Sequence, residues 1–265
     1  MLLPRLLRAT KRRLKAVKNA AQRAWLIYRG RGASSLMVVA GRNLTRRIGA
    51  PVGRHHEYLR HKAEVDRHFD AERGVNTEGV QNLFDFTIVG SNLSHGVSHV
   101  AADPSDFAEG LATLSIEPSG FSFVDLGSGK GRALLLAADA GFSAVIGVEF
   151  ALELHEIAIA NIRAFAVQKP VLAARIKVVH ADAISFSLPR TPLVVFLFNP
   201  FDAVVCRQVA SNILESWNAF PRPIHVFYMN PIEFNTWIEA GWRLTKRARP
   251  YALLEPRDQS EKGDT

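Results

Sequence analysis

One segment sets the architecture of this chain: Phe123-Val124-Asp125-Leu126-Gly127-Ser128-Gly129-Lys130-Gly131-Arg132. It begins as a short apolar strand, breaks into three glycines at alternate positions, and continues into an apolar helix over 133–140. Glycine tolerates backbone angles that a Cβ forbids, so a ligand can lie directly against the main chain. The free amides at the start of the following helix can bind a carboxylate or a phosphate. The segment therefore predicts the strand, turn and helix of a nucleotide-binding α/β unit.

Two kinds of ligand compete for such a loop. The dinucleotide fingerprint is G-x-G-x-x-G, whereas the spacing here is G-x-G-x-G and Arg132 occupies the position of the third glycine. Asp125 stands two residues before the first glycine. An acid there repels a pyrophosphate and suits a ligand with a cationic end, such as the ammonium and sulfonium of S-adenosylmethionine. The residues favour S-adenosylmethionine over NAD, and the remaining alternative is a tight turn without a ligand.

The composition is that of a globular protein with one large domain and an appendage. Of the 265 residues, 48% are apolar, yet no apolar run approaches the roughly 20 residues of a membrane span. The single cysteine, Cys206, excludes an internal disulfide and a cysteine-based zinc cluster, and we expect it to pack in the core. Four histidines (His55, His56, His61 and His68) match no familiar metal site in their spacing, so no metal is predicted.

The charge is unevenly placed along the chain. Residues 1–50 hold 13 of the 33 Lys and Arg and no acid, so the rest carries 20 basic against 25 acidic residues. Residues 2–28 have the spacing of a basic amphipathic helix. Such a helix, within residues 1–30, could attach to an anionic membrane surface or a nucleic acid, pack on the domain, or stay solvated.

The location follows from the same segment. No continuous apolar region follows the basic residues, which argues against a secretory signal. We expect a cytoplasmic protein, peripheral to the membrane if the basic arm binds lipid. An acid-free, Arg-rich start also resembles a mitochondrial transit peptide, which would place the protein in the mitochondrion.

The core alternates strands and helices. Strands are predicted at 121–126, 144–149, 175–180, 193–198 and 224–229, helices at 58–69, 130–140, 151–166, 202–218 and 232–239, and a closing hairpin over 242–254. This alternation predicts an α/β fold: a doubly wound, mostly parallel sheet with a helical N-terminal extension.

Four domains or segments are predicted: a basic arm and linker (1–54), a helical and lid segment (55–102), a cofactor-binding domain (103–255) and a flexible polar tail (256–265). Within the second, the polar stretch 84–104 is expected to fold over the glycine loop as a lid. It carries His95 and His99 one helical turn apart, and either is a loop histidine or contacts substrate.

In a parallel sheet, ligands bind beyond the carboxyl ends of the strands. Glu149 ends the second strand, 22 residues after Gly127, and could accept both ribose hydroxyls, as it also could in a dinucleotide enzyme. Asp182, followed by Ala183, comes after the third strand and could accept from the exocyclic amine of adenine. Exposed strand-end acids are the alternative, but acids follow three successive strands.

The fourth strand ends in Asn199-Pro200-Phe201. The Asn199 carbonyl could accept a hydrogen from an amine and so aim the nitrogen lone pair at a methyl group, while Phe201 offers an apolar face. Methyl transfer demands mainly alignment and a dry site. The alternative is a turn that merely ends the strand.

With these residues assembled, the stretch 103–254 resembles the class I (seven-stranded) S-adenosylmethionine-dependent methyltransferases. The matching residues are Asp125-x-Gly127-x-Gly129-x-Gly131, Glu149, Asp182 and Asn199-Pro200-Phe201. The resemblance implies cofactor contacts from Asp125, Gly127, Ser128, Gly129, Gly131, Glu149, Asp182, Ala183 and Asn199, and catalysis by Asn199 and Phe201.

More narrowly, 124–131 with Gly147-Val148-Glu149 resembles uncharacterised bacterial members that are similar to the non-SET histone-lysine and mitochondrial protein-lysine methyltransferases. That resemblance implies a protein side chain of the lysine type as methyl acceptor. The Asn-Pro-Phe turn is also similar to the Asn/Asp-Pro-Pro-aromatic motif of enzymes that methylate amines of adenine or glutamine, although the second proline is missing.

Two further functions stay open. An RNA or DNA base N-methyltransferase could grip phosphates with the basic arm, although the rest of the chain is net acidic. A non-catalytic, S-adenosylmethionine-binding interaction protein is the alternative outside the enzymes.

Overall fold

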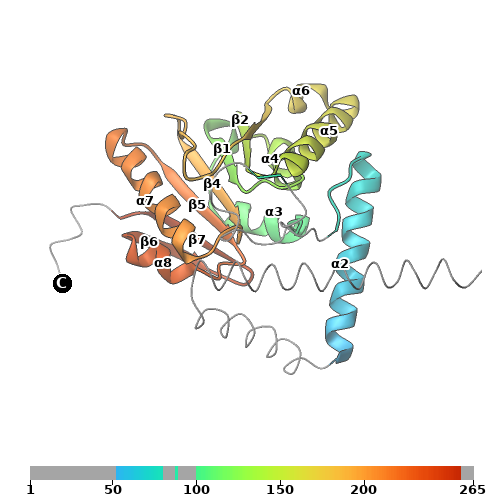
Figure 1. Ribbon diagram of the computed structural model, residues 1–265, viewed down its shortest axis with the longest axis horizontal. Helices are drawn as coiled ribbons and strands as arrows, with labels where there is room; N and C mark the ends of the chain where they lie inside the picture. The colour runs from blue at the N-terminus through green and yellow to red at the C-terminus, as the bar shows by residue number, and fades with distance from the viewer. Residues whose placement is uncertain (1–51, 80–86, 89–99, 258–265) are drawn as a thin grey trace, which may run out of the picture. The chain divides into compact units, whose positions relative to one another are not determined.

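The computed structural model describes residues 52–79, 87–88 and 100–257, with side chains from Arg60 onward (Figure 1). The chain divides into two units, 1–60 and 61–265, and helix α2 (Val52–Arg73) runs through the division. The predicted basic helix, most of the linker, His95, His99 and most of the polar tail lie outside the described residues. Among the described helices, none is long and apolar enough to cross a membrane.

Unit 61–265 is built on a seven-stranded sheet in the order β3-β2-β1-β4-β5-β7-β6. Its strands are β1 (Ser122–Leu126), β2 (Ala144–Glu149), β3 (Ile176–His180), β4 (Leu193–Phe198), β5 (Ile224–Met229), β6 (Trp242–Arg247) and β7 (Tyr251–Pro256). The first five are parallel, and β7 is antiparallel to both β5 and β6. The predicted fold class, the five parallel strands and the closing hairpin are confirmed.

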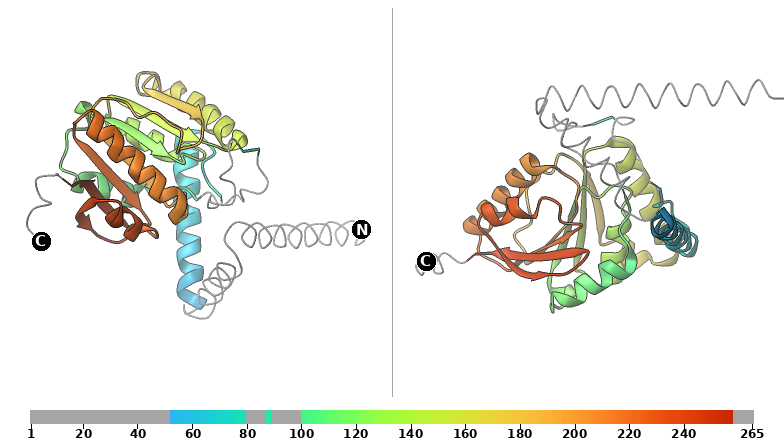
Figure 2. Two further views of the ribbon diagram at one scale, coloured as in Figure 1. Left: turned by 60° about the vertical axis from the view of Figure 1, so that its left-hand side comes forward. Right: turned by 90° about the horizontal axis from the view of Figure 1, so that it is seen from below.

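Helices cover both faces of the sheet (Figures 1 and 2). One face carries α3 (Pro104–Thr113), α4 (Arg132–Asp139), α5 (Leu152–Gln168) and α6 (Pro170–Ala173); the other carries α7 (Ala203–Ala219) and α8 (Phe234–Glu239). Successive strand residues alternate between these faces, so Phe123 packs toward α4 and Val124 toward α7. Helix α6 and a 3₁₀ turn at Pro118–Gly120 are not predicted from the sequence.

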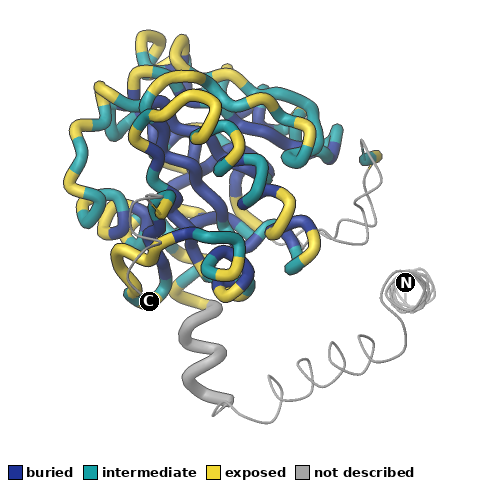
Figure 3. The backbone as a smooth tube through the Cα atoms, turned by 90° about the vertical axis from the view of Figure 1, so that its left-hand side faces the viewer, coloured by how far each residue is buried: buried dark blue, intermediate teal, exposed yellow. Residues whose placement is uncertain are grey.

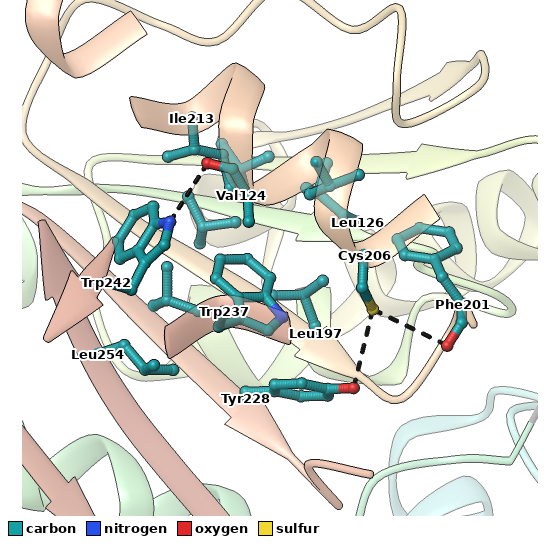
Figure 4. Packing of buried hydrophobic residues seen from close by; sticks show 14 of the residues in the cluster. Val124, Leu126, Leu197, Phe201, Cys206, Ile213, Tyr228, Trp237, Trp242 and Leu254 are labelled. Atoms are coloured by element: carbon teal, nitrogen blue, oxygen red, sulfur yellow. Dashed lines mark hydrogen bonds between the residues drawn. The ribbon is translucent and has the colours of Figure 1, made fainter. Parts of the chain in front are cut away.

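Two aromatic-rich cores hold the layers together, and Figure 3 shows the buried stretches of the chain gathered in the interior. In the first, Phe107 lies between the rings of Phe123, Phe196 and Phe227, with centroids 5.4–5.8 Å away. In the second, shown in Figure 4, Cys206 on α7 is fully buried, as predicted. Burial raises the pKa of its thiol to about 12, so the reactive thiolate is disfavoured.

Candidate active site

A cavity open to solvent lies at the carboxyl edge of the parallel strands; its empty space, about 620 Å³, includes open solvent. It lies where the strand order reverses between β1 and β4, the position at which open α/β sheets bind ligands. Predicted site residues from three strand ends line it together: Asp125, Gly127, Ser128, Gly129, Glu149, Asn199 and Phe201. The structure therefore brings most of the predicted site into one cavity.

The glycine loop has the backbone that its sequence predicts. Gly127, Gly129 and Gly131 have φ angles of +90°, +53° and +87°, which disfavour residues with a Cβ. A Cβ on Gly127 would lie 2.6 Å from the Cβ of Pro200, so the loop packs against the Asn-Pro-Phe turn. Gly131 instead caps α4 beside Ala158 and does not line the cavity. Its contact with a cofactor stays a prediction.

Two buried acids, Asp125 and Glu149, form one wall, each 3% exposed. Burial raises the pKa of Asp125 well above its usual value, and the charge of Glu149 raises it further. Burial also raises the pKa of Glu149 to about 7, against the opposing effect of hydrogen bonds from backbone N–H groups. A buried acid with a raised pKa is strongly stabilised in its ionised form by a cationic neighbour.

Glu149 also shapes the loop. Its Oε2 accepts a hydrogen bond from Gly129 N (2.7 Å) and its Oε1 from Ala151 N (2.9 Å). Each carboxylate oxygen has a second lone pair, which leaves it able to accept from a ribose hydroxyl. Ser128 lines the cavity as well, although its hydroxyl is buried toward Gly147.

Arg132 is the one cationic side chain among the described residues that line the cavity. It is 2% exposed and forms an ion pair with Asp66, a longer one with Asp70 (3.5 Å) and a hydrogen bond to Thr77 Oγ1 (2.7 Å). Both aspartates come from α2, and they compensate the Arg132 charge. The wall therefore presents two acids without an opposing free cation.

The turn after α2 supports the glycine loop from outside. Lys130 Nζ donates to Asn76 Oδ1 (3.2 Å) and to the Glu78 carbonyl (2.6 Å). Asn161 on α5 accepts from Asn76 N (2.8 Å) and donates to the Lys130 carbonyl (2.9 Å). This role was not predicted from the sequence, because the partners of this turn lie more than 50 residues further along the chain.

The Asn199 turn completes the cavity. Asn199 has a φ of +45° and is 8% exposed, and its Oδ1 accepts a hydrogen bond from the Tyr228 hydroxyl (3.3 Å). A left-handed residue other than glycine costs on the order of 1–3 kcal/mol, and such residues cluster at functional sites. Phe201 is 8% exposed and lines the same cavity.

A second cavity, whose empty space of about 310 Å³ includes open solvent, adjoins the first and shares Gly127, Phe150 and Phe201 with it. The predicted adenine residues Asp182 and Ala183 line it. Asp182 Oδ1 accepts from Ile184 N (3.0 Å), which orients the carboxylate. The adenine contact stays a prediction.

Parts of the predicted lid reach the same edge of the sheet. Val100, Ala101 and Ala102 line the first cavity, and Ile88 pairs with Ala151 in an isolated antiparallel bridge. His95 and His99 lie outside the described residues, so their substrate role is untested.

The unit therefore has a seven-stranded, Rossmann-like α/β fold. No family model matches the sequence, and no curated protein matches it. Solved structures similar to it include "a predicted N6-adenine-specific DNA methylase" from Listeria monocytogenes (17% identity, TM-score 0.46, 59% of this chain and 51% of that one). Others are the glycopeptide N-methyltransferase MtfA with S-adenosylmethionine (13%, 0.45, 58% and 93%) and an S-adenosylmethionine-dependent O-methyltransferase from Thermotoga maritima (15%, 0.44, 60% and 67%).

This chain spans about half the length of the Listeria methylase. With TM-scores below 0.5, these likenesses carry no argument. The fold follows from the sheet topology, and the activity has to be inferred from the site residues.

Proposed function

We propose that this protein is an S-adenosylmethionine-dependent N-methyltransferase whose acceptor is a protein side-chain amine of the lysine type. The choice of cofactor rests on the cavity wall formed by Asp125 and Glu149. The cation that lines the cavity, Arg132, is already paired with Asp66 and Asp70. Such a wall favours a ligand with a cationic end, because a positive charge there stabilises the ionised form of both acids.

In this proposal each end of the cofactor has a partner. The ammonium lies near Asp125, the ribose hydroxyls donate to Glu149, and adenine occupies the second cavity near Asp182 and Ala183. The backbone of Gly127 and Gly129 provides the close approach, since neither carries a Cβ.

The acceptor half rests on Asn199. Its carbonyl would accept an N–H of the incoming amine and direct the nitrogen lone pair at the methyl carbon. The N–C bond forms as the S–C bond breaks, the electron pair of that bond stays on sulfur, and the amine loses its proton to solvent. Phe201 would line the approach. The choice of a lysine-type amine as acceptor rests on the resemblance of residues 124–131 and Gly147-Val148-Glu149 to protein-lysine methyltransferases.

Isothermal titration of the purified protein with S-adenosylmethionine and with NAD tests the cofactor. We expect binding of S-adenosylmethionine alone. Binding of NAD without S-adenosylmethionine would remove the proposal.

The acceptor is tested with methyl-labelled S-adenosylmethionine and fractionated cell lysate, followed by protease or nuclease. Protease-sensitive label supports a protein acceptor. Nuclease-sensitive label would instead support an RNA or DNA base methyltransferase. Cofactor binding without transfer in any fraction would support the non-catalytic interaction protein.

A further inference from the structure

Two neighbouring strands end in the same unusual turn. Asn199-Pro200 follows β4 and Asn230-Pro231 follows β5, and the last residues of these strands, Phe198 and Met229, are register partners. Both asparagines have left-handed backbones, with φ of +45° and +48°. The Asn199 turn is buried and lines the cavity, whereas Asn230 is exposed. The two turns therefore lie side by side at the edge where the acceptor would approach.

One side chain joins these turns. The Tyr228 hydroxyl donates to Asn199 Oδ1 (3.3 Å) and accepts from the backbone N–H of Glu233, in the second turn (3.4 Å). Its ring is fully buried against Trp237, and Figure 4 shows the hydroxyl directed toward Cys206 and the Phe201 turn. Tyr228 itself does not line the cavity, so it acts on a ligand through a neighbour, and the cavity-lining neighbour to which its hydroxyl donates is Asn199.

We propose that Tyr228 is a positioning residue that holds the Asn199 carbonyl in the direction needed by the acceptor amine. This inference rests on the proposed function and adds to it a group outside the cavity. A carbonyl oxygen has two lone pairs, so the bond from Tyr228 leaves one for the amine. Transfer depends strongly on alignment, and a freely rotating Asn199 amide would lose it.

The chemistry of the hydroxyl fits this role. Burial raises the pKa of Tyr228 far above its usual value, so the group stays protonated and remains a donor. The nearby Cys206 thiol (4.0 Å) and the charge of Glu233 act on the same hydroxyl, and neither replaces its bond to Asn199.

An acceptor-free experiment tests the assignment with two cofactor analogues. Sinefungin carries a C–NH₂ group where S-adenosylmethionine has S–CH₃, and S-adenosylhomocysteine has no group there. An oriented Asn199 carbonyl can accept from the amine of sinefungin but has no partner in S-adenosylhomocysteine. We expect Tyr228→Phe to weaken sinefungin binding about five- to tenfold, as for one lost hydrogen bond, and to leave S-adenosylhomocysteine affinity nearly unchanged.

Tyr251→Phe is the matched control. Tyr251 is equally buried on the adjacent strand β7, but its hydroxyl bonds Thr113 and Glu109 away from the cavity. This variant should change neither affinity. Tyr228→Phe should also have no further effect on sinefungin in the Asn199→Ala background, because the hydroxyl acts through Asn199.

The outcomes separate the two claims. If the unmodified protein binds neither analogue, the proposed function fails and the Tyr228 assignment falls with it. If it binds both and Tyr228→Phe leaves their affinity ratio unchanged, only the Tyr228 assignment fails. Equal loss of both analogues in Tyr228→Phe would show a purely structural hydroxyl and would overturn the assignment too.

Discussion

At the scale of one residue, the burial of Asp125 favours binding of a cationic ligand and lowers the stability of the ligand-free fold. The Asp125 carboxyl is 3% exposed and accepts no hydrogen bond from the described residues. Because burial raises its pKa, the folded state favours the protonated acid, and its contribution to stability is lost as pH rises above the usual value for Asp. A bound cation would reverse that penalty.

Asp125→Asn should therefore stabilise the ligand-free protein at about pH 8 while weakening S-adenosylmethionine binding at least about tenfold, the effect of losing one strong charge partner. Thermal unfolding and titration calorimetry measure the two effects. Asp139→Asn is the control, since Asp139 ends α4 and pairs with Lys169 and Arg73 outside the cavity. Unchanged affinity in Asp125→Asn would count directly against the cofactor assignment.

Glu149 should give cofactor binding a pH dependence. Its pKa is about 7 in the ligand-free fold, raised by burial, so its contribution to stability is present below about pH 4.5 and is lost as pH rises through 7. The ionised carboxylate is the better acceptor for ribose hydroxyls, so affinity should rise between about pH 6 and pH 8, by at most about tenfold per pH unit. Calorimetry across this range measures it.

In Glu149→Gln the rise in cofactor affinity near pH 7 should disappear, because the amide does not titrate there. Any dependence that remains would belong to Asp125, whose pKa is also raised. If Glu149→Gln keeps the full rise in cofactor affinity, a group other than Glu149 binds the proton.

At the scale of elements, the site depends on contact between the glycine loop and the Asn-Pro-Phe turn. Gly127→Ala and Gly141→Ala separate backbone strain from this contact, since φ is +90° at Gly127 and +94° at Gly141. Both variants should lose about 1–2 kcal/mol from left-handed strain. Gly127→Ala should lose roughly 1–3 kcal/mol more, because its Cβ would lie 2.6 Å from Pro200, whereas nothing lies within 4 Å at Gly141.

Urea unfolding of the two variants gives the difference in free energy. Equal losses would mean that Pro200 moves away without cost. The loop and the turn would then be independent elements.

The strands were predictable because each is a short apolar run between turn residues, a pattern typical of a buried strand. All five parallel strands lie within one residue of their predicted bounds. Helix α2 was predicted only over 58–69, whereas it extends over Val52–Arg73. Its ends were missed because the helix has no apolar stripe that would mark them. Ion pairs hold it instead: Asp66 binds Lys62 one turn away on its own helix and, at long range, Arg132 at the start of α4.

The candidate site was predictable as far as each strand end carries its own polar group. Asp125, Glu149 and Asn199 follow from local pattern and from the rule that parallel strands end at one edge. The Arg132–Asp66 pair and the Tyr228–Asn199 bond were not, because each joins residues from separate elements that only the packed fold brings together. An arginine or a tyrosine in a sequence does not indicate which distant residue it will contact.

At the scale of the whole molecule, charge and site belong to different units. All residues that line the two cavities fall within 100–205, inside unit 61–265. Residues 1–30 carry nine Lys or Arg and no acid. This separation suggests that the basic arm serves attachment or macromolecular binding and that the cofactor site works without it.

Deleting residues 1–30 should leave S-adenosylmethionine affinity unchanged and abolish salt-sensitive binding to anionic liposomes or to nucleic acid. Calorimetry measures the first effect, and co-sedimentation at low and high salt measures the second. A full-length variant with these nine basic residues changed to Gln separates charge from length, and it should lose the same binding. If the deletion instead lowers cofactor affinity and thermal stability together, residues 1–30 are a packed structural helix. Attachment would then have to come from another surface.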